Sequence, residues 1–127
     1  MFKITPIQDF TEQENIAKAC ASRARLGFFA YKMVDAESGE LMGFSQFEIL
    51  DGYAFISDIK PAGEFNDFEA MFILAKSTMN FIDLCGTRIC KADEHTAEEK
   101  LLLSAGFKNY MCDMTGMFDG SHCKGHK

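Results

Sequence analysis

Two carboxylates stand in segments that otherwise have the apolar character of buried strands. Glu48 lies in LMGFSQFEIL and Asp58 lies in YAFISDI. A carboxylate at such a position can take the proton that an amine loses when it attacks a carbonyl carbon, which is general-base chemistry. Alternation along a strand predicts that Asp58 shares a face with Ala54 and Ile56, and Glu48 with Gln46. Both carboxylates are candidate bases, and a solvated strand face is the alternative for each.

The loop PAGEFNDFEA (61–70) joins the second of these segments to a long apolar stretch. A strand that feeds a helix start is a common phosphate site, because free backbone N–H groups and the helix dipole converge there. This loop has no basic residue, and it carries Glu64, Asp67 and Glu69. Unit charges 4 Å apart interact by about 4 kcal/mol at an effective dielectric of 20. Weak phosphate binding is therefore expected, and capping the helix is the simpler role for these carboxylates.

The end of the chain, DGSHCKGHK, holds a second group of reactive side chains. His122 and His126 lie four residues apart with Cys123 between them, and both residue types bind zinc or copper. The neighbouring glycines argue against a helix. The sequence therefore predicts a flexible polar tail over 121–127 and no bound metal, with metal binding by the tail as an alternative.

The five cysteines stand at irregular spacings and form no CxxC pair. All five are expected to be free thiols in a reduced, cytoplasmic protein. Four of them stand among apolar residues and are predicted to be buried: Cys20, Cys85, Cys90 and Cys112.

Length and charge exclude several classes of protein. The 127 residues fit a single domain, 1–127. The formal net charge is −6 and the basic residues are scattered, which argues against a nucleic-acid partner. No apolar run is long enough for a membrane span, and MFKITPIQDF is no signal peptide. A small-molecule ligand is the expected partner, and the sequence leaves a homodimer open.

Hydrophobic periodicity and turn residues give a sequence of alternating elements. A stripe that includes Phe72 and Met79 predicts a long helix over about 67–84, covered on most sides. Residues Thr11, Asn66 and Thr96 are each followed by Glu three positions later, which predicts that they cap helices. The remaining predicted elements are strands at 2–7, 28–35, 41–50, 53–59, 87–94 and 108–118, and helices at 9–27 and 95–107.

This order resembles that of the Gcn5-related N-acetyltransferase (GNAT) superfamily. Four features carry the resemblance over residues 28–118: a three-stranded meander that ends in ISDIKP, the long apolar helix, the strand RICKADE, and a last helix that ends in SAGF. The resemblance implies an α+β fold, with a mixed, mostly antiparallel sheet and helices on both faces. It also implies acetyl-CoA as the cofactor, with Ile59, Lys60, Asn66 and Asp67 as the residues that hold it.

The motifs depart from the superfamily pattern. That pattern has glycines and a basic residue in the loop after Pro61, where this chain has Glu64 and Asp67. It also has a tyrosine acid in the last helix, where this chain has Leu102, and an Asn where His95 stands. Three hypotheses follow: a divergent N-acyltransferase for a small amine, with weakened or lost acetyl-CoA chemistry; a non-catalytic ligand-binding or interaction module on the same fold; and a metal-binding protein.

Overall fold

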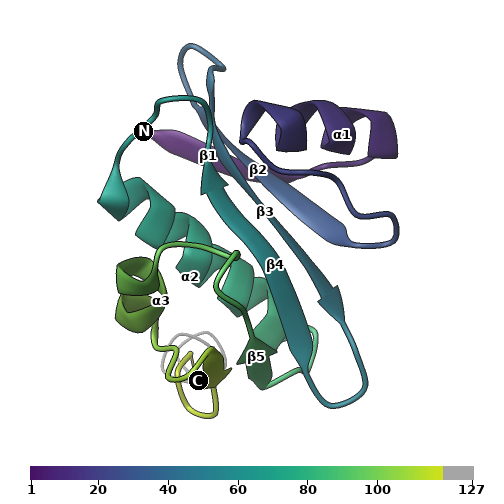
Figure 1. The fold of residues 1–127 in the computed structure, drawn as a ribbon, viewed down its shortest axis with the longest axis vertical. Helices are drawn as coiled ribbons and strands as arrows, with labels where there is room; N and C mark the ends of the chain where they lie inside the picture. The colour runs from purple at the N-terminus through teal and green to yellow at the C-terminus, as the bar shows by residue number, and fades with distance from the viewer. Residues whose placement is uncertain (119–127) are drawn as a thin grey trace, which may run out of the picture.

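The structure, a computed structural model, describes residues 1–118 (Figure 1). These residues form one sheet and three helices. None of the helices in this range is long and apolar enough to cross a membrane. The elements in chain order are β1 (Phe2–Pro6), α1 (Phe10–Ala19), β2 (Phe29–Asp35), β3 (Leu41–Ile49), β4 (Ala54–Pro61), α2 (Phe68–Leu84), β5 (Ile89–Lys91), α3 (Glu99–Ala105) and β6 (Met111–Asp113).

The strands lie in the sheet in the same order as in the chain, from β1 to β6. Every neighbouring pair is antiparallel except β4 and β5, which run parallel. Parallel strands need a crossover connection, and α2 supplies it. The helix α1 covers one face of the sheet, whereas α2 and α3 lie on the other side (Figure 1). The predicted fold class, a mixed and mostly antiparallel sheet with helices on both faces, is confirmed.

The larger part of the core lies between the sheet and α2. The predicted apolar stripe of α2 is confirmed at Met79, which is completely buried, whereas Phe72 is only partly buried. Asp83, near the end of α2, is also buried, and its Oδ1 lies 3.2 Å from Nε of Arg88. The buried carboxylate of Asp83 is thus paired with the guanidinium of Arg88, which follows α2 in the chain.

The helix ends differ from the capping predictions. The side chain of Asp9 accepts from the Glu12 amide at 2.8 Å, so Asp9 and not Thr11 caps α1. Asp67 and not Asn66 caps α2, with 3.1 Å to the Ala70 amide. In both cases the aspartate stands immediately before the first helical residue, where its short side chain reaches the third amide. The helix α1 also ends at Ala19, well before the predicted residue 27.

A bulge in β4 corrects the predicted face of Asp58. Gln46 pairs with Asp58 and Phe47 pairs with Ile56, so Ser57 is an extra residue in β4. Such a residue shifts the alternation by one. Asp58 therefore does not share a face with Ala54 and Ile56. It shares the α1 face with Gln46, whereas Ile56 belongs to the core under α2.

The four described cysteines are free thiols. Burial is confirmed for Cys20, Cys90 and Cys112, but Cys85 at the end of α2 is exposed. Cys123 and the rest of the predicted tail lie outside the described residues.

Candidate functional site

The bulge presents Asp58 to three uncharged donors. Oδ1 accepts from Nε2 of Gln46 at 2.8 Å and from Oγ of Ser57 at 2.7 Å, and Oδ2 accepts from Oγ of Ser22. The residue is 5 % exposed. Each carboxylate oxygen has two acceptor positions, so Oδ2 keeps one for a further proton donor. This geometry suits a general base and also suits a purely structural carboxylate.

Gln46 links this carboxylate to α1 and to the loop 20–28. It is completely buried, and its Oε1 accepts from Nε2 of Gln13 at 2.6 Å and from the Arg25 amide at 2.8 Å. Its Nε2 also donates to the Arg23 carbonyl at 3.1 Å. The sequence analysis missed Gln13, Gln46 and Ser22. The one available signal was a glutamine at position 13, on the helical face that Ala17 and Cys20 continue.

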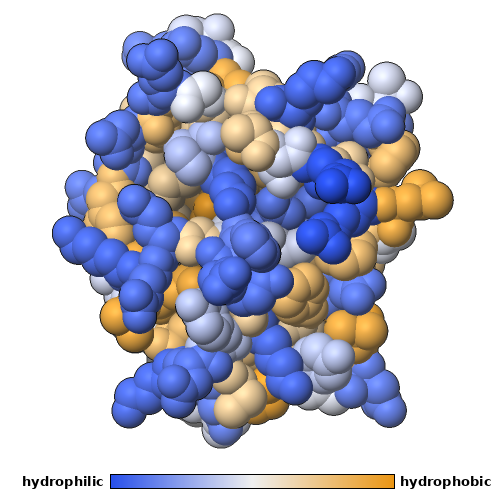
Figure 2. Space-filling view, in the orientation of Figure 1, coloured by the Kyte–Doolittle hydropathy of each residue, from blue (hydrophilic) through white to orange (hydrophobic). Residues whose placement is uncertain are grey.

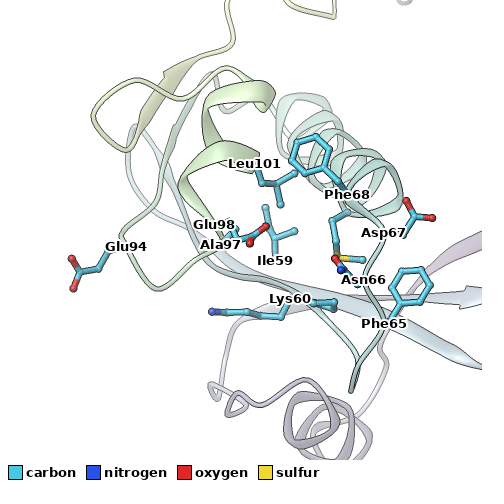
Figure 3. Close-up of a pocket in the computed structure, with 12 residues that line it drawn as sticks. Ile59, Lys60, Phe65, Asn66, Asp67, Phe68, Glu94, Ala97, Glu98 and Leu101 are labelled. Carbon is cyan, nitrogen blue, oxygen red and sulfur yellow. The ribbon is translucent and has the colours of Figure 1, made fainter.

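A first cavity, the helix cavity, lies between β4, the start of α2 and the start of α3 (Figure 3). Its volume is about 430 Å³. All four residues predicted to hold a cofactor line it: Ile59, Lys60, Asn66 and Asp67. The side chains of Ile59, Phe68 and Leu101 point inward in Figure 3, whereas Asp67 points outward. The wall also includes Met71 and two further carboxylates, Glu94 and Glu98.

A second cavity, the loop cavity, lies on the side of the loop after α1. Its volume is about 420 Å³, and Asp58 and Lys60 line it from β4. Lys60 lines both cavities. Residues 58–60 of β4 thus carry the candidate base on the α1 side of the sheet and two candidate cofactor residues, Ile59 and Lys60, at the wall of the helix cavity. The structure does not bring Glu48 there: it pairs with Phe55, is partly exposed and lines neither cavity.

The loop 61–67 directs several of its amides into the protein. The amide of Ala62 donates to the Met42 carbonyl at 2.9 Å, and that of Gly63 donates to the Ala19 carbonyl at 2.9 Å. The amide of Phe65 donates within the loop, to the Ala62 carbonyl at 2.8 Å. These three amides are therefore not available to a phosphate. The exposed Glu64 adds negative charge beside them.

Strands β4 and β5 separate after two paired positions, and the segment 93–96 fills the gap. Thr96 is completely buried, and its Oγ donates to the Ile56 carbonyl at 2.7 Å and accepts from the Asp93 amide at 3.0 Å. The Thr96 carbonyl accepts from the Ile59 amide at 2.8 Å. The predicted capping role of Thr96 is therefore wrong, and α3 begins later, at Glu99. The Thr96 hydroxyl instead donates to the Ile56 carbonyl, which has no partner in β5.

Two other expectations concern acid–base groups and metals. Leu102, at the tyrosine position of the superfamily, is buried and offers no proton. His95 is exposed and lines the loop cavity. Within residues 1–118, no group of three His, Cys, Asp or Glu side chains is placed to hold a metal ion. The tail residues His122, Cys123 and His126 lie outside this range.

Superposition on solved structures supports the description of the fold. No protein-family model and no curated protein sequence matches the chain. The ribosomal-protein-S18-alanine N-acetyltransferase of Escherichia coli superposes with a TM-score of 0.66 at 13% identity, over 85% of this chain and 78% of that one. The PaiA N-acetyltransferase of Thermoplasma acidophilum, solved in complex with coenzyme A, gives a TM-score of 0.67 at 10% identity, over 89% and 99%. The chain therefore has the fold of the GNAT N-acetyltransferases.

Proposed function

We propose that the protein is a divergent N-acyltransferase of this fold, with an acyl thioester of coenzyme A as donor and a small amine as acceptor. The observation that carries the proposal is the placement of residues 58–60. Asp58 lines the loop cavity, whereas Ile59 and Lys60 line the helix cavity. A base and a candidate donor site therefore stand on consecutive residues of one strand.

The residues of the helix cavity fit one part of the donor and not another. Its inner wall, from Ile59, Met71 and Leu101, suits an apolar acyl chain and the uncharged arm of coenzyme A. The rim does not suit the diphosphate, because amides of the loop bond to the protein and carboxylates surround the start of α2. Weak donor binding, carried by the arm, follows from this arrangement.

The chain's own chemical contribution is made by Asp58. A bound thioester would supply the activated acyl group. As the acceptor nitrogen forms its bond to the acyl carbon it loses a proton, and Oδ2 of Asp58 is the oxygen with a position left to take it. The C–S bond of the thioester would break in the same transfer, and coenzyme A would leave as a thiolate that takes its proton from solvent. Gln46 and Ser57 fix the carboxylate through Oδ1.

Mass spectrometry of acylated amines tests the proposal. Wild-type protein, acetyl-CoA at millimolar concentration and a mixture of small primary amines should give acetylated product above the rate without protein. Asp58→Asn should lower this rate by about a hundredfold or more, whereas Glu48→Gln should keep it. Circular dichroism melting shows whether Asp58→Asn still folds. Ser22→Ala removes a single bond to Oδ2 and serves as the milder variant.

A non-catalytic binding module is the second candidate, and the bonded amides of the loop favour it. If the wild-type protein yields no acylated amine above background, the acyltransferase proposal is wrong. Saturable binding of coenzyme A without turnover, or of an amine without coenzyme A, then supports the module.

A further inference from the structure

The loop cavity has a charge opposite to that of the helix cavity. Besides Asp58, its charged lining residues are Arg23, Arg25 and Lys60, together with the titratable His95. The helix cavity has Glu98 at its wall and the carboxylates of Asp67 and Glu94 at its rim, both pointing outward in Figure 3, against the same Lys60. An anion therefore has a favourable site on the loop side of β4 and an unfavourable one on the helix side.

The two arginines are held at the cavity by their backbones and not by ion pairs. Gln46 bonds both to the Arg23 carbonyl and to the Arg25 amide, which fixes the loop that carries them. Within residues 1–118, neither guanidinium lies within ion-pair distance of a carboxylate. Arg25 lies over the ring of Phe28, with 5.7 Å from Cζ to the centroid. In Figure 2 the most hydrophilic surface of this face lies beside α1, where this loop runs.

Asp58 forms no hydrogen bond with either arginine or with Lys60 within residues 1–118, so it does not neutralise their positive charge directly. Its oxygens accept from Gln46, Ser57 and Ser22, all uncharged donors. The ammonium group of Lys60 donates to the His95 carbonyl. Because this acceptor is neutral, the bond does not compensate the positive charge of Lys60. A guanidinium binds a carboxylate or phosphate by two parallel hydrogen bonds, so Arg23 and Arg25 are suited to such a group.

We propose that the loop cavity selects an acceptor that carries an anionic group as well as its amine, with Arg23 and Arg25 binding the anion and the amine placed beside Asp58. The acceptor is then a small zwitterion, an amine with a carboxylate or a phosphate. This inference rests on the proposed function for the role of the amine, but binding of the anion is independent of catalysis.

Binding of three matched amines tests the inference without any donor. Ethanolamine carries an amine and a neutral hydroxyl, whereas β-alanine has a carboxylate and O-phosphoethanolamine a phosphate in addition to the amine. Each is titrated into the ¹⁵N-labelled full chain, and the amide shifts of Ser22, Arg25 and Asp58 are followed. One or both zwitterions should bind at least about tenfold more tightly than ethanolamine, a factor that corresponds to about 1.4 kcal/mol. The two zwitterions distinguish a carboxylate from a phosphate as the preferred group.

The variant Arg23→Gln/Arg25→Gln should lose this preference, with affinity for the zwitterions falling about tenfold and affinity for ethanolamine unchanged or raised. Lys3→Gln/Lys108→Gln makes the same change in net charge at exposed residues outside the cavity, and should behave as wild type. Equal weak shifts with all three amines, or equal binding by wild type and the arginine variant, would overturn the inference. Acyl transfer only to amines that lack an anionic group would overturn it too, while leaving the proposed function intact.

Discussion

Nε2 of Gln46 donates to Oδ1 of Asp58 across 2.8 Å, at the point where β4 has its extra residue. The bond joins two facing positions of β3 and β4 on the α1 side of the sheet. Since Oε1 of the same amide accepts from Gln13 and from the Arg25 backbone, one side chain fixes the candidate base, the helix and the loop of the arginines. The orientation of Asp58 thus depends on residues from three separate segments.

Gln46→Leu should destabilise the protein by about 1–3 kcal/mol for each buried group that it leaves unpaired. The replaced amide is completely buried, and leucine of similar size can neither donate to Asp58 nor accept from Gln13. Urea denaturation followed by circular dichroism measures the loss. Gln8→Leu, at an exposed position, is the control and should change stability little. A similar small change at both positions would mean that water replaces the network.

Thr96→Val should cost about 1–3 kcal/mol, because valine has the same shape and cannot pair the Ile56 carbonyl or the Asp93 amide. The loss is measured by denaturant melting. Thr11→Val makes the same replacement at an exposed position of α1 and should be almost neutral. If the two variants lose equal stability, segment 93–96 is not the element that closes the gap between β4 and β5.

Local sequence patterns were sufficient to predict most helices and strands, but they were not sufficient to predict the contacts between them. The stripe of α2 is a property of one segment, so burial of Met79 could be predicted from period alone. A bulge depends on how two strands pair, and alternation within β4 therefore assigned Asp58 to the wrong face. Thr96 has the local pattern of a helix cap, but the free carbonyl of Ile56, forty positions away, competes for its hydroxyl. The pairing of Gln13 with Gln46 is hidden for the same reason.

The buried thiols predict a loss of stability at high pH. Burial, and secondarily the charge of Asp58, raises the pKa of Cys20 to about 12 from 9.0. Burial, followed by Cys112 and Asp83, raises the pKa of Cys90 to about 12 as well. Above about pH 9 the unfolded thiols ionise and the folded ones do not. The stabilisation that is complete below pH 9 is therefore lost progressively toward pH 12, by about 1.4 kcal/mol per pH unit for each thiol.

Urea midpoints at a series of pH values between about 8 and 11 test this slope. Cys20→Ala/Cys90→Ala should be less stable near pH 8 and should lose less further stability as pH rises. Cys85→Ala, at an exposed thiol, should keep the wild-type slope. Identical slopes in all three proteins would show that other groups, such as lysines, account for the whole pH dependence.

The acidic start of α2 predicts millimolar affinity for acetyl-CoA and a specific way to improve it. Asp67 must be kept because it caps the Ala70 amide, but the exposed side-chain carboxylates of Glu64 and Glu69 accept no hydrogen bond within residues 1–118. Replacing both by glutamine removes two negative charges beside the helix start. Affinity should then rise by about tenfold, since even a screened unit charge at 4 Å is worth about 1 kcal/mol in water.

The affinity is measured by chemical-shift titration, and the matched control is Glu14→Gln/Glu37→Gln, which changes the net charge equally at exposed positions in α1 and in the turn after β2. Equal gains in acetyl-CoA affinity in both double variants would mean that the net charge of the protein, and not the position of the carboxylates, causes the effect. Micromolar binding of acetyl-CoA by the wild type would contradict the prediction that the carboxylates at the start of α2 weaken its binding. The amides at the start of α2 would then suffice for the diphosphate without glycines or a basic residue, which would strengthen the acyltransferase proposal against the binding module.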